Sequence, residues 1–258
     1  MKKLLMLMFC VVMALAMAGC GVGDKKAETQ AAGKVLKVAT DANFPPFEYY
    51  LENSKAHTGF DIDLMNAVAK KMGYEKVEFV NVEFKDIFNG LSEKKYDAAI
   101  AGISITPERE RIAEFTEPYA EDGYKIVVGK KAAPGDDFPS LEGKTVAAEE
   151  GSYALEMLKN NVKTAKIVPV HDTEAGIKLV ADGKADALVA SKIAASFFIA
   201  NNYADKVRFA GEKVLYADKI GIAVARGNNE LEKKMNEALK EVKRSGEYNK
   251  IYSSYFGK

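Results

Sequence analysis

The 258-residue sequence has no tryptophan, two cysteines and two histidines, and these scarcities exclude most familiar catalytic chemistry. Cys10 lies inside an N-terminal apolar run and Cys20 comes just after it. The rest of the chain therefore has no disulfide, no thiol nucleophile and no cysteine metal site. His57 and His171 lie in polar segments, and neither has a partner at metal-ligand spacing. No nucleophile-elbow, zinc-protease or phosphate-loop pattern occurs, so we predict no catalytic residue, no metal and no cofactor.

The N-terminal segment has the pattern of an export signal. Lys2 and Lys3 form a basic start, Leu4–Met17 is almost continuously apolar, and small residues lead to Cys20. The apolar run is too short for a membrane-spanning helix. We predict a signal peptide over residues 1–19. Small residues directly before a cysteine resemble the bacterial lipobox, which implies lipidation of Cys20; the alternative is an ordinary secretory signal with an incidental cysteine.

Residues 20–33, rich in Ala, Gly, Lys and Asp, are predicted to be a flexible, lipidated tether. The protein is then held at the extracytoplasmic side of a membrane, on the periplasmic or cell-surface side, by its lipid anchor. Loss of Lys2 and Lys3 with the signal leaves 35 basic against 37 acidic side chains, a net charge of −2. No basic excess indicates a nucleic-acid partner.

From residue 34 onward, short apolar runs alternate with amphipathic segments. This alternation predicts an α/β fold with mostly parallel sheets. Helix 61–73 is expected to begin with Asp61 as its cap and Asp63 as a first-turn charge, and to stop at Gly73. The other predicted helices cover 84–94, 152–159, 173–182, 192–200 and 229–245. The predicted strands cover 34–40, 77–82, 96–103, 125–128, 145–148, 165–170, 185–190 and 220–225.

Arg109 occupies an unusual place for a cation. Thr106 and Pro107 have the pattern of an N-cap and a first helical residue, directly after the predicted strand 96–103. A cation in the first turn opposes the helix dipole. Beside unpaired backbone N–H groups, a guanidinium forms a socket for an anion. The alternative is a surface ion pair with Glu110 or Glu114, and the local sequence favours neither.

Several motifs in order resemble one protein family. They are Thr40-Asp41 with Phe44-Pro45-Pro46-Phe47-Glu48, Gly59-Phe60-Asp61-Ile62-Asp63-Leu64, Ala101-Gly102-Ile103-Ser104-Ile105-Thr106 with Glu108-Arg109, Phe115-Thr116 before Pro118-Tyr119, and the segment from Gly246 to Phe256. Together they resemble the solute-binding lipoproteins of bacterial polar amino acid ABC transporters, family 3, which have the two-lobed periplasmic binding protein type II fold. The resemblance implies a monomer that captures an amino acid and delivers it to an ABC transporter permease.

The resemblance also implies the domain organisation. Lobe 1 is discontinuous and takes residues 34–120 and 219–258, while lobe 2 takes residues 124–215. Two hinge crossings are expected near Tyr119–Gly123 and Tyr216–Ile220. A ligand is expected where the strands end at the lobe interface.

Lobe 1 is expected to supply most of the ligand contacts. By resemblance, Arg109 pairs with the ligand α-carboxylate, and Gly102 and Ser104 donate to the same group. Asp41 matches an acid at the pocket rim. Phe44 and Phe84 match two aromatics that enclose the aliphatic part of the ligand; core packing is the alternative for each.

Lobe 2 matches less well. Glu149, Ser152 and Tyr153 occupy a strand-to-helix turn that supplies ligand contacts in the family. Successive strand residues point to opposite sides, so only one of Glu149 and Glu150 should face the cleft, and the resemblance favours Glu149. The alternative is that both decorate a helix N-terminus.

Ser191 departs from the family pattern, because relatives have there an aspartate that pairs with the ligand α-ammonium. Glu149 and Asp41 are candidates to replace this charge. Two alternatives follow from the departure: a ligand that is a carboxylate without an amino group, or a cyclohexadienyl dehydratase-like enzyme that acts on arogenate or prephenate with Glu149 as general acid. A sensory receptor domain is a further alternative, but the sequence has no transmembrane or signalling segment to support it.

Overall fold

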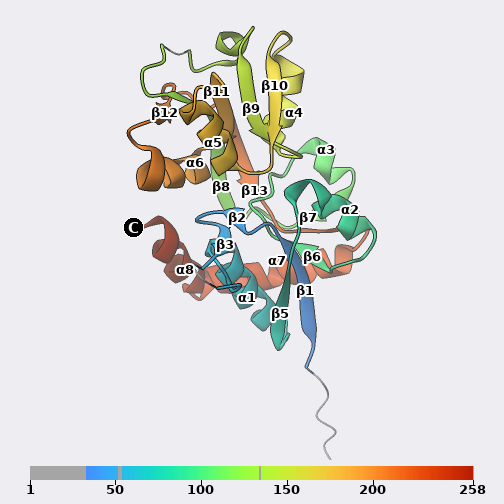
Figure 1. Cartoon of the computed structure of the whole chain (residues 1–258). Helices are drawn as coiled ribbons and strands as arrows, with labels where there is room; N and C mark the ends of the chain where they lie inside the picture. Colours follow the sequence, from blue (N-terminus) through green and yellow to red (C-terminus); the bar gives the residue numbers. More distant parts are fainter. Residues whose placement is uncertain (1–32, 52–53, 134, 258) are drawn as a thin grey trace, which may run out of the picture. The chain divides into compact units, whose positions relative to one another are not determined.

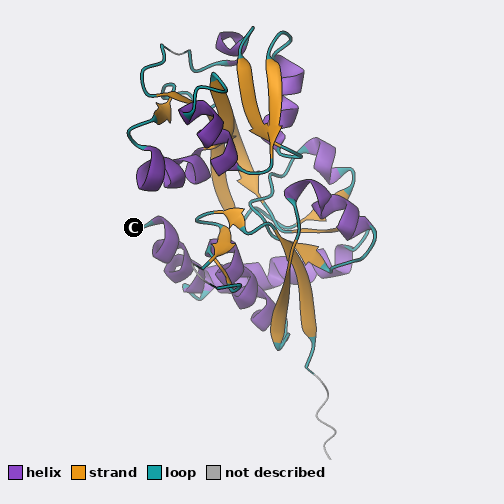
Figure 2. Ribbon diagram, viewed as in Figure 1, coloured by secondary structure: helices purple, strands orange, loops and turns teal. Residues whose placement is uncertain are grey.

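The computed structural model describes residues 33–51, 54–133 and 135–257, which fall into one compact unit. The predicted signal peptide 1–19, Cys20 and the tether as far as residue 32 lie outside the described residues. Within the described ranges, no helix is long and apolar enough to cross a membrane. The protein has two main sheets with separate helix layers, so the predicted α/β class is confirmed (Figures 1 and 2).

The first sheet has the strand order β5-β1-β6-β14-β7. Its strands are β1 (Val35–Thr40), β5 (Lys76–Asn81), β6 (Ala98–Ala99), β7 (Ala113–Phe115) and β14 (Ala223–Ala225). β5, β1 and β6 run parallel, whereas β14 is antiparallel to both of its neighbours. A strand from the end of the chain therefore lies inside the sheet formed by the beginning.

Helices α1 (Phe60–Lys71), α7 (Asn229–Arg244) and α8 (Glu247–Phe256) contact one another in Figure 1. Leu64 and Val68 recur on one face of α1 and are fully buried with Leu239 of α7. This apolar stripe explains why the helix was predictable. Phe256 packs its ring on Phe60, which fixes the C-terminal helix to α1.

The cap prediction for α1 is wrong. Its N-cap is Gly59, with a φ of 127° and no side-chain cap, and Asp61 is a fully buried residue of the first turn. Asp61 accepts hydrogen bonds from the Gly102 N–H at 2.9 Å and the Tyr119 hydroxyl at 2.7 Å. Its carboxyl therefore joins α1 to two loops and does not cap its own helix.

The other predicted elements of this region are shorter than expected. The segment 84–94 is a 3₁₀ turn (Phe84–Asp86) followed by α2 (Ile87–Ser92). The predicted strand 96–103 keeps only β6, because the chain turns away toward the short helix α3 (Pro107–Glu110). A small antiparallel sheet of β2 (Asn43–Phe44), β3 (Glu48–Tyr50) and β4 (His57–Thr58) was not predicted.

The second sheet has the order β10-β9-β11-β8-β12, and β13 pairs with β8 beyond that path. Its strands are β8 (Ala120–Gly129), β9 (Thr145–Glu149), β10 (Lys166–Val170), β11 (Ala187–Ser191), β12 (Val207–Phe209) and β13 (Tyr216–Ile220). Helices α4 (Tyr153–Asn161), α5 (Thr173–Ala181) and α6 (Lys192–Phe198) pack on it, with a 3₁₀ turn at Phe138–Leu141 and a π-helical turn at Ile199–Tyr203. β10, β9 and β11 are parallel, and the strands paired to β8 are antiparallel.

The two predicted crossings form a hydrogen-bonded ribbon. β8 and β13 pair antiparallel, from Ala120 opposite Ile220 to Tyr124 opposite Tyr216. Ser104, in the loop before α3, makes an isolated bridge to Ile220. The ribbon connects the two main sheets and brings the loop of Ser104 and Arg109 against it.

Candidate functional site

A cavity lies where the strands of both main sheets end. Its lining residues are Asp41, Asn43, Phe44, Glu48, Phe84, Ala101, Gly102, Tyr124, Glu149, Ser152, Ala154, Thr173, Leu188, Val189, Ala190 and Ser191. The parallel strands explain this convergence. Asp41 follows β1, Glu149 ends β9 and Ser191 ends β11, and the carboxyl ends of parallel strands are where α/β sheets place ligands.

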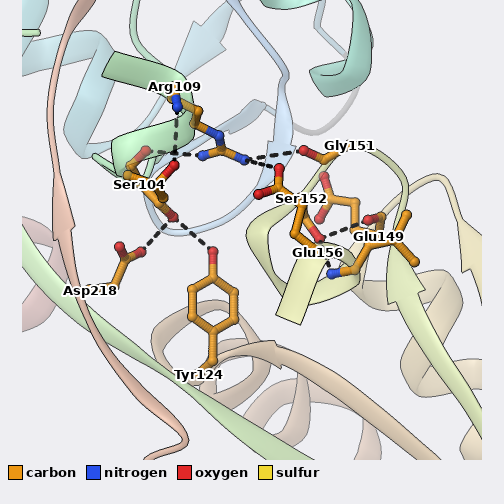
Figure 3. Close-up of polar contacts among 10 residues, drawn as sticks. Ser104, Arg109, Tyr124, Glu149, Gly151, Ser152, Glu156 and Asp218 are labelled. Atoms are coloured by element: carbon orange, nitrogen blue, oxygen red, sulfur yellow. Dashed lines mark hydrogen bonds and ion pairs between the residues drawn. The ribbon is translucent and has the colours of Figure 1, made fainter. Parts of the chain in front are cut away.

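Arg109 is buried, with 3 % of its surface exposed, and it faces backbone oxygens (Figure 3). Thr106 accepts from the Arg109 N–H and Pro107 begins the helix, as predicted. Nη1 donates to the Ser104 carbonyl and Nη2 to the Gly151 carbonyl, both at 3.1 Å. The alternative prediction, a surface ion pair of Arg109 with Glu110 or Glu114, is wrong. Arg109 Nη2 instead lies 3.9 Å from a carboxylate oxygen of Glu156.

The Arg109 guanidinium has five N–H donors, and the two hydrogen bonds leave others for an anion. It lies 5.4 Å from the centre of the Phe84 ring, which itself lines the cavity. Arg109 is not among the lining residues in this conformation. Its role toward a ligand carboxylate stays a prediction.

Ser104 also lies outside the lining, because its hydroxyl is engaged at the ribbon (Figure 3). It donates to Asp218 Oδ2 at 2.8 Å and lies 2.9 Å from the Tyr124 hydroxyl. Burial raises the pKa of Asp218 to about 7. The hydroxyl expected to reach a ligand therefore joins the Arg109 loop to both strands of the ribbon.

Gly102 lines the cavity and needs to be glycine. Its φ is +54°, and a Cβ there would lie 2.7 Å from the ring of Phe44. Its N–H, predicted to serve the ligand, donates to Asp61 in this structure. Gly102 therefore lets Phe44 come close to the backbone, which places that ring in the cavity wall.

Asp41 and Phe84 are coupled on the opposite part of the wall. Asp41 Oδ2 accepts from the Phe84 N–H at 2.9 Å. Burial raises the pKa of Asp41 to about 6, an effect that outweighs this hydrogen bond. The carboxyl is thus oriented by the backbone at the start of the 3₁₀ turn and lies beside the Phe84 ring.

Glu149, which ends β9, and Glu150, which follows it, face opposite sides, as the alternation of side chains along a strand predicts. Glu149 is buried and lines the cavity, and burial raises its pKa to about 8. Glu150 is exposed and pairs with Lys85 at 3.2 Å. A buried acid is thereby presented to the cavity by β9.

Ser152 and Tyr153, the next predicted contacts, diverge. Ser152 lines the cavity and caps α4, accepting from the Leu155 N–H at 3.3 Å. Tyr153 is not in the lining; its ring packs against Tyr124 and Tyr216. The sequence placed both on the right turn, but the helix start directs only the serine to the cavity.

Ser191 lines the cavity and caps α6, accepting from the Ala194 N–H at 3.1 Å. Its hydroxyl also donates to a carboxyl oxygen of Asp122 on β8. Asp122 accepts from the Ile193 N–H at 3.3 Å, and burial raises its pKa. Asp122 therefore lies next to Ser191, the position at which relatives have an aspartate. The antiparallel pairing of β8 with β11 brings Asp122 there, and the sequence did not predict that pairing.

Sequence reasoning missed several lining residues, among them Asn43, Tyr124, Thr173 and above all Glu48. Glu48 ends the motif that carried the family resemblance, yet its role was not considered. It is fully buried, and neither carboxyl oxygen has a hydrogen-bond donor. The sequence did offer one signal for Glu48: it is a glutamate at the end of a turn that otherwise consists of aromatic residues and prolines.

The cavity wall is acidic. Asp41, Glu48 and Glu149 contribute carboxyl groups, and no Lys, Arg or His belongs to the lining among the described residues. The same part of the chain has no cluster of His, Cys, Asp and Glu able to hold a metal ion. A buried acidic wall favours a ligand that carries positive charge.

Residues 36–258 match the family described as bacterial extracellular solute-binding proteins, family 3. The chain therefore belongs to that family, which acts outside the cytoplasm. It is 34 % identical over 250 residues to a probable histidine-binding protein of Neisseria gonorrhoeae, covering 95 % of this chain and 92 % of that one.

Two solved structures are informative neighbours. An ancestral arginine-binding protein bound to arginine has a TM-score of 0.82 and 38 % identity, covering 86 % of this chain and 98 % of the other. An ancestral amino acid-binding protein, a precursor of cyclohexadienyl dehydratase, has a TM-score of 0.77 and 33 % identity, covering 86 % and 95 %. The relative linked to the dehydratase is thus itself an amino acid-binding protein, and the family to which the chain belongs consists of solute-binding proteins.

Proposed function

We propose that this protein captures an amino acid with a cationic or polar side chain and delivers it to an ABC importer. The observation that carries the proposal is the cavity at the strand ends of both sheets, with buried acids Asp41, Glu48 and Glu149 in its wall. Relatives named for binding arginine and histidine support a basic amino acid. The proposed lobes are residues 34–120 with 219–258, and residues 124–215.

The ligand-binding set divides by charge. Arg109 provides the spare donors for an α-carboxylate, and the rings of Phe44 and Phe84 contact the aliphatic chain. The acids of the wall face the cationic end. Asp122, which holds the Ser191 hydroxyl, is the proposed partner of the α-ammonium. Binding of one ligand by both lobes stabilises the closed form, and that form docks on the permease.

A thermal-shift screen followed by calorimetry tests the binding role. Arginine, lysine, histidine and glutamine should raise the melting temperature, and their des-amino analogues should not, because the α-ammonium would be missing. Asp122→Asn should reduce the difference in melting temperature between the amino acids and their des-amino analogues. Asp182→Asn, which changes a surface residue, should leave that difference unchanged. Stabilisation by des-amino acids equal to that by amino acids would instead identify a carboxylate-binding protein.

We also propose that the protein acts as a monomer anchored by lipid on Cys20. The support is the sequence pattern before Cys20, which lies outside the described residues. Mass spectrometry of the membrane fraction should find a diacylglycerol-modified N-terminal cysteine, and Cys20→Ser should release the protein from the membrane. Wild-type protein recovered without lipid would leave the ordinary secretory signal as the explanation.

A further inference from the structure

Glu48 is a buried acid of the proposed ligand site, and the proposed function does not explain why it is buried without a hydrogen-bond donor. It comes from β3, has no exposed surface and lines the cavity. Neither of its carboxyl oxygens has a hydrogen-bond donor. An ionised carboxylate in such a place is costly, because it has lost water without gaining a partner.

The group beside Glu48 is a second buried acid. Asp61 is fully buried, and its Oδ2 accepts from the Gly102 N–H and the Tyr119 hydroxyl. Its Oδ1 has no donor. The two carboxyl groups interact with each other, so a proton between them joins Asp61 Oδ1 to one oxygen of Glu48 and leaves the other Glu48 oxygen free.

The surrounding charges act in the same direction. Burial and then the charge of Asp61 raise the pKa of Glu48 well above its usual range, and Asp41 and Glu149 add to this from β1 and β9. Burial raises the pKa of Asp61 to about 6, opposed by its hydrogen bonds. Tyr119, facing the pair from the start of the ribbon, is neutral because its own pKa is raised. The charged groups that act most strongly on Glu48 are therefore all acids.

We propose that Glu48 and Asp61 share one proton in the ligand-free protein and that Glu48 releases it when a ligand cation enters the cavity. The inference rests on the proposed function and adds a coupling between ligand charge and protonation. The Glu48 carboxylic acid loses H⁺ to solvent, and the resulting carboxylate pairs with the guanidinium or ammonium of the ligand. No bond between heavy atoms forms or breaks.

The coupling gives the site two modes. A neutral side chain leaves the proton in place between Glu48 and Asp61. A cationic side chain replaces the proton. Affinity for a cation should then rise with pH by up to about tenfold per unit as long as free Glu48 is protonated, because one proton leaves per ligand bound.

Arginine and citrulline separate the two modes, since they share the α-carboxylate, the α-ammonium and the chain length and differ in side-chain charge. Calorimetry at pH 7 in phosphate, HEPES and Tris, which differ in ionisation enthalpy, gives the number of protons released. Wild type should release one more proton with arginine than with citrulline. Its arginine affinity should increase from pH 7 to pH 8.5, and its citrulline affinity should stay nearly constant.

Glu48→Gln isolates the responsible group from Glu149, which is also protonated near neutral pH. The variant should lose the extra proton released with arginine, lose most of the preference for arginine over citrulline and still bind citrulline. Glu78→Gln, which removes an exposed glutamate of β5, should behave as wild type. If Glu48→Gln does not fold, as judged by circular dichroism, Glu149→Gln decides: it should keep the extra proton released with arginine, and loss of that proton would assign the coupling to Glu149 and overturn the proposal.

Equal proton release with arginine and citrulline, or an unchanged extra proton in folded Glu48→Gln, overturns the proposal. A wild type that binds only neutral amino acids also overturns it while leaving the binding role intact. A wild type that binds no amino acid removes the proposed function itself. The three failures are therefore distinguishable.

Discussion

Single residues of the site take their roles either from their neighbours in the sequence or from contacts between distant segments. Thr106 and Pro107 set the start of α3 by short-range rules and so place Arg109 in the first turn, whereas the local sequence left the burial of Arg109 open. Glu149 and Glu150 separated by simple strand alternation. The positions of Asp122 and of the Glu48–Asp61 pair depend on contacts between distant segments, and no local sequence pattern predicts them.

Arg109→Ala should weaken amino acid binding by about 2–5 kcal/mol, because a desolvated ligand carboxylate would be left unpaired. Arg109→Lys should also bind poorly, since an ammonium cannot replace a planar fork of donors. Calorimetry with the best ligand of the screen measures both. Arg226→Ala, which removes an exposed arginine paired with Glu114, is the matched control. Near-unchanged affinity in the Arg109 variants would assign that residue to holding the Ser104 and Gly151 carbonyls alone.

At the scale of elements, Ser191 joins three parts of the second sheet. It ends β11, caps α6 and holds Asp122 of β8. Ser191→Ala should lower the free energy of unfolding by about 0.5–2 kcal/mol through the lost cap, as at other helix N-termini. Urea denaturation measures the change. Ser196→Ala, exposed within the same helix, should leave the midpoint nearly unchanged; equal effects of the two substitutions would argue against a capping role.

Element prediction from sequence succeeded where periodicity was long and failed where tertiary contacts decide. The stripe of α1 and the strand β1 were found because each carries a clear apolar period. Strands β2, β3 and β4 have two or three residues each, too few for a period. Asp61 was taken for a cap because an acid near a helix start is common there, and its burial depends on Gly102 and Tyr119, far along the chain.

For the whole molecule, the buried acids predict an unusual pH dependence of stability. Burial raises the pKa of Asp218 to about 7 and that of Glu149 to about 8, and it raises the pKa of Glu48 well above its usual range. The folded state therefore binds more protons than the unfolded state between pH 7 and pH 8.5, so the free energy of unfolding falls as pH rises through this window.

The melting temperature of the ligand-free protein should accordingly be higher at pH 7 than at pH 8.5, as measured by calorimetry at constant ionic strength. Glu149→Gln should flatten the dependence by removing one of the titrating groups, and Glu78→Gln should not. His57 works in the opposite direction, because burial lowers its pKa, but it titrates below this window. A melting temperature that rises from pH 7 to pH 8.5 would contradict the protonation states assigned here.

Ligand-driven closure is the other prediction at this scale. We expect the β8–β13 ribbon to act as the hinge, because a ligand bound by both proposed lobes would favour the compact form. Small-angle scattering should show a smaller radius of gyration at saturating ligand than without it. A profile unchanged at calorimetrically verified saturation would mean binding without closure, which removes the hinge mechanism and not the binding role.

The position of β14 between β6 and β7 also fixes an order of assembly. Residues 124–215 build their sheet and helices from one continuous stretch, whereas the first sheet stays incomplete until the strand at Ala223–Ala225 arrives. During synthesis or export from the N-terminus, the first stretch to appear is thus the last able to finish its core. A nascent chain that lacks the residues from Ala223 onward keeps its first sheet incomplete, so we expect this core to form only after the whole chain has been made.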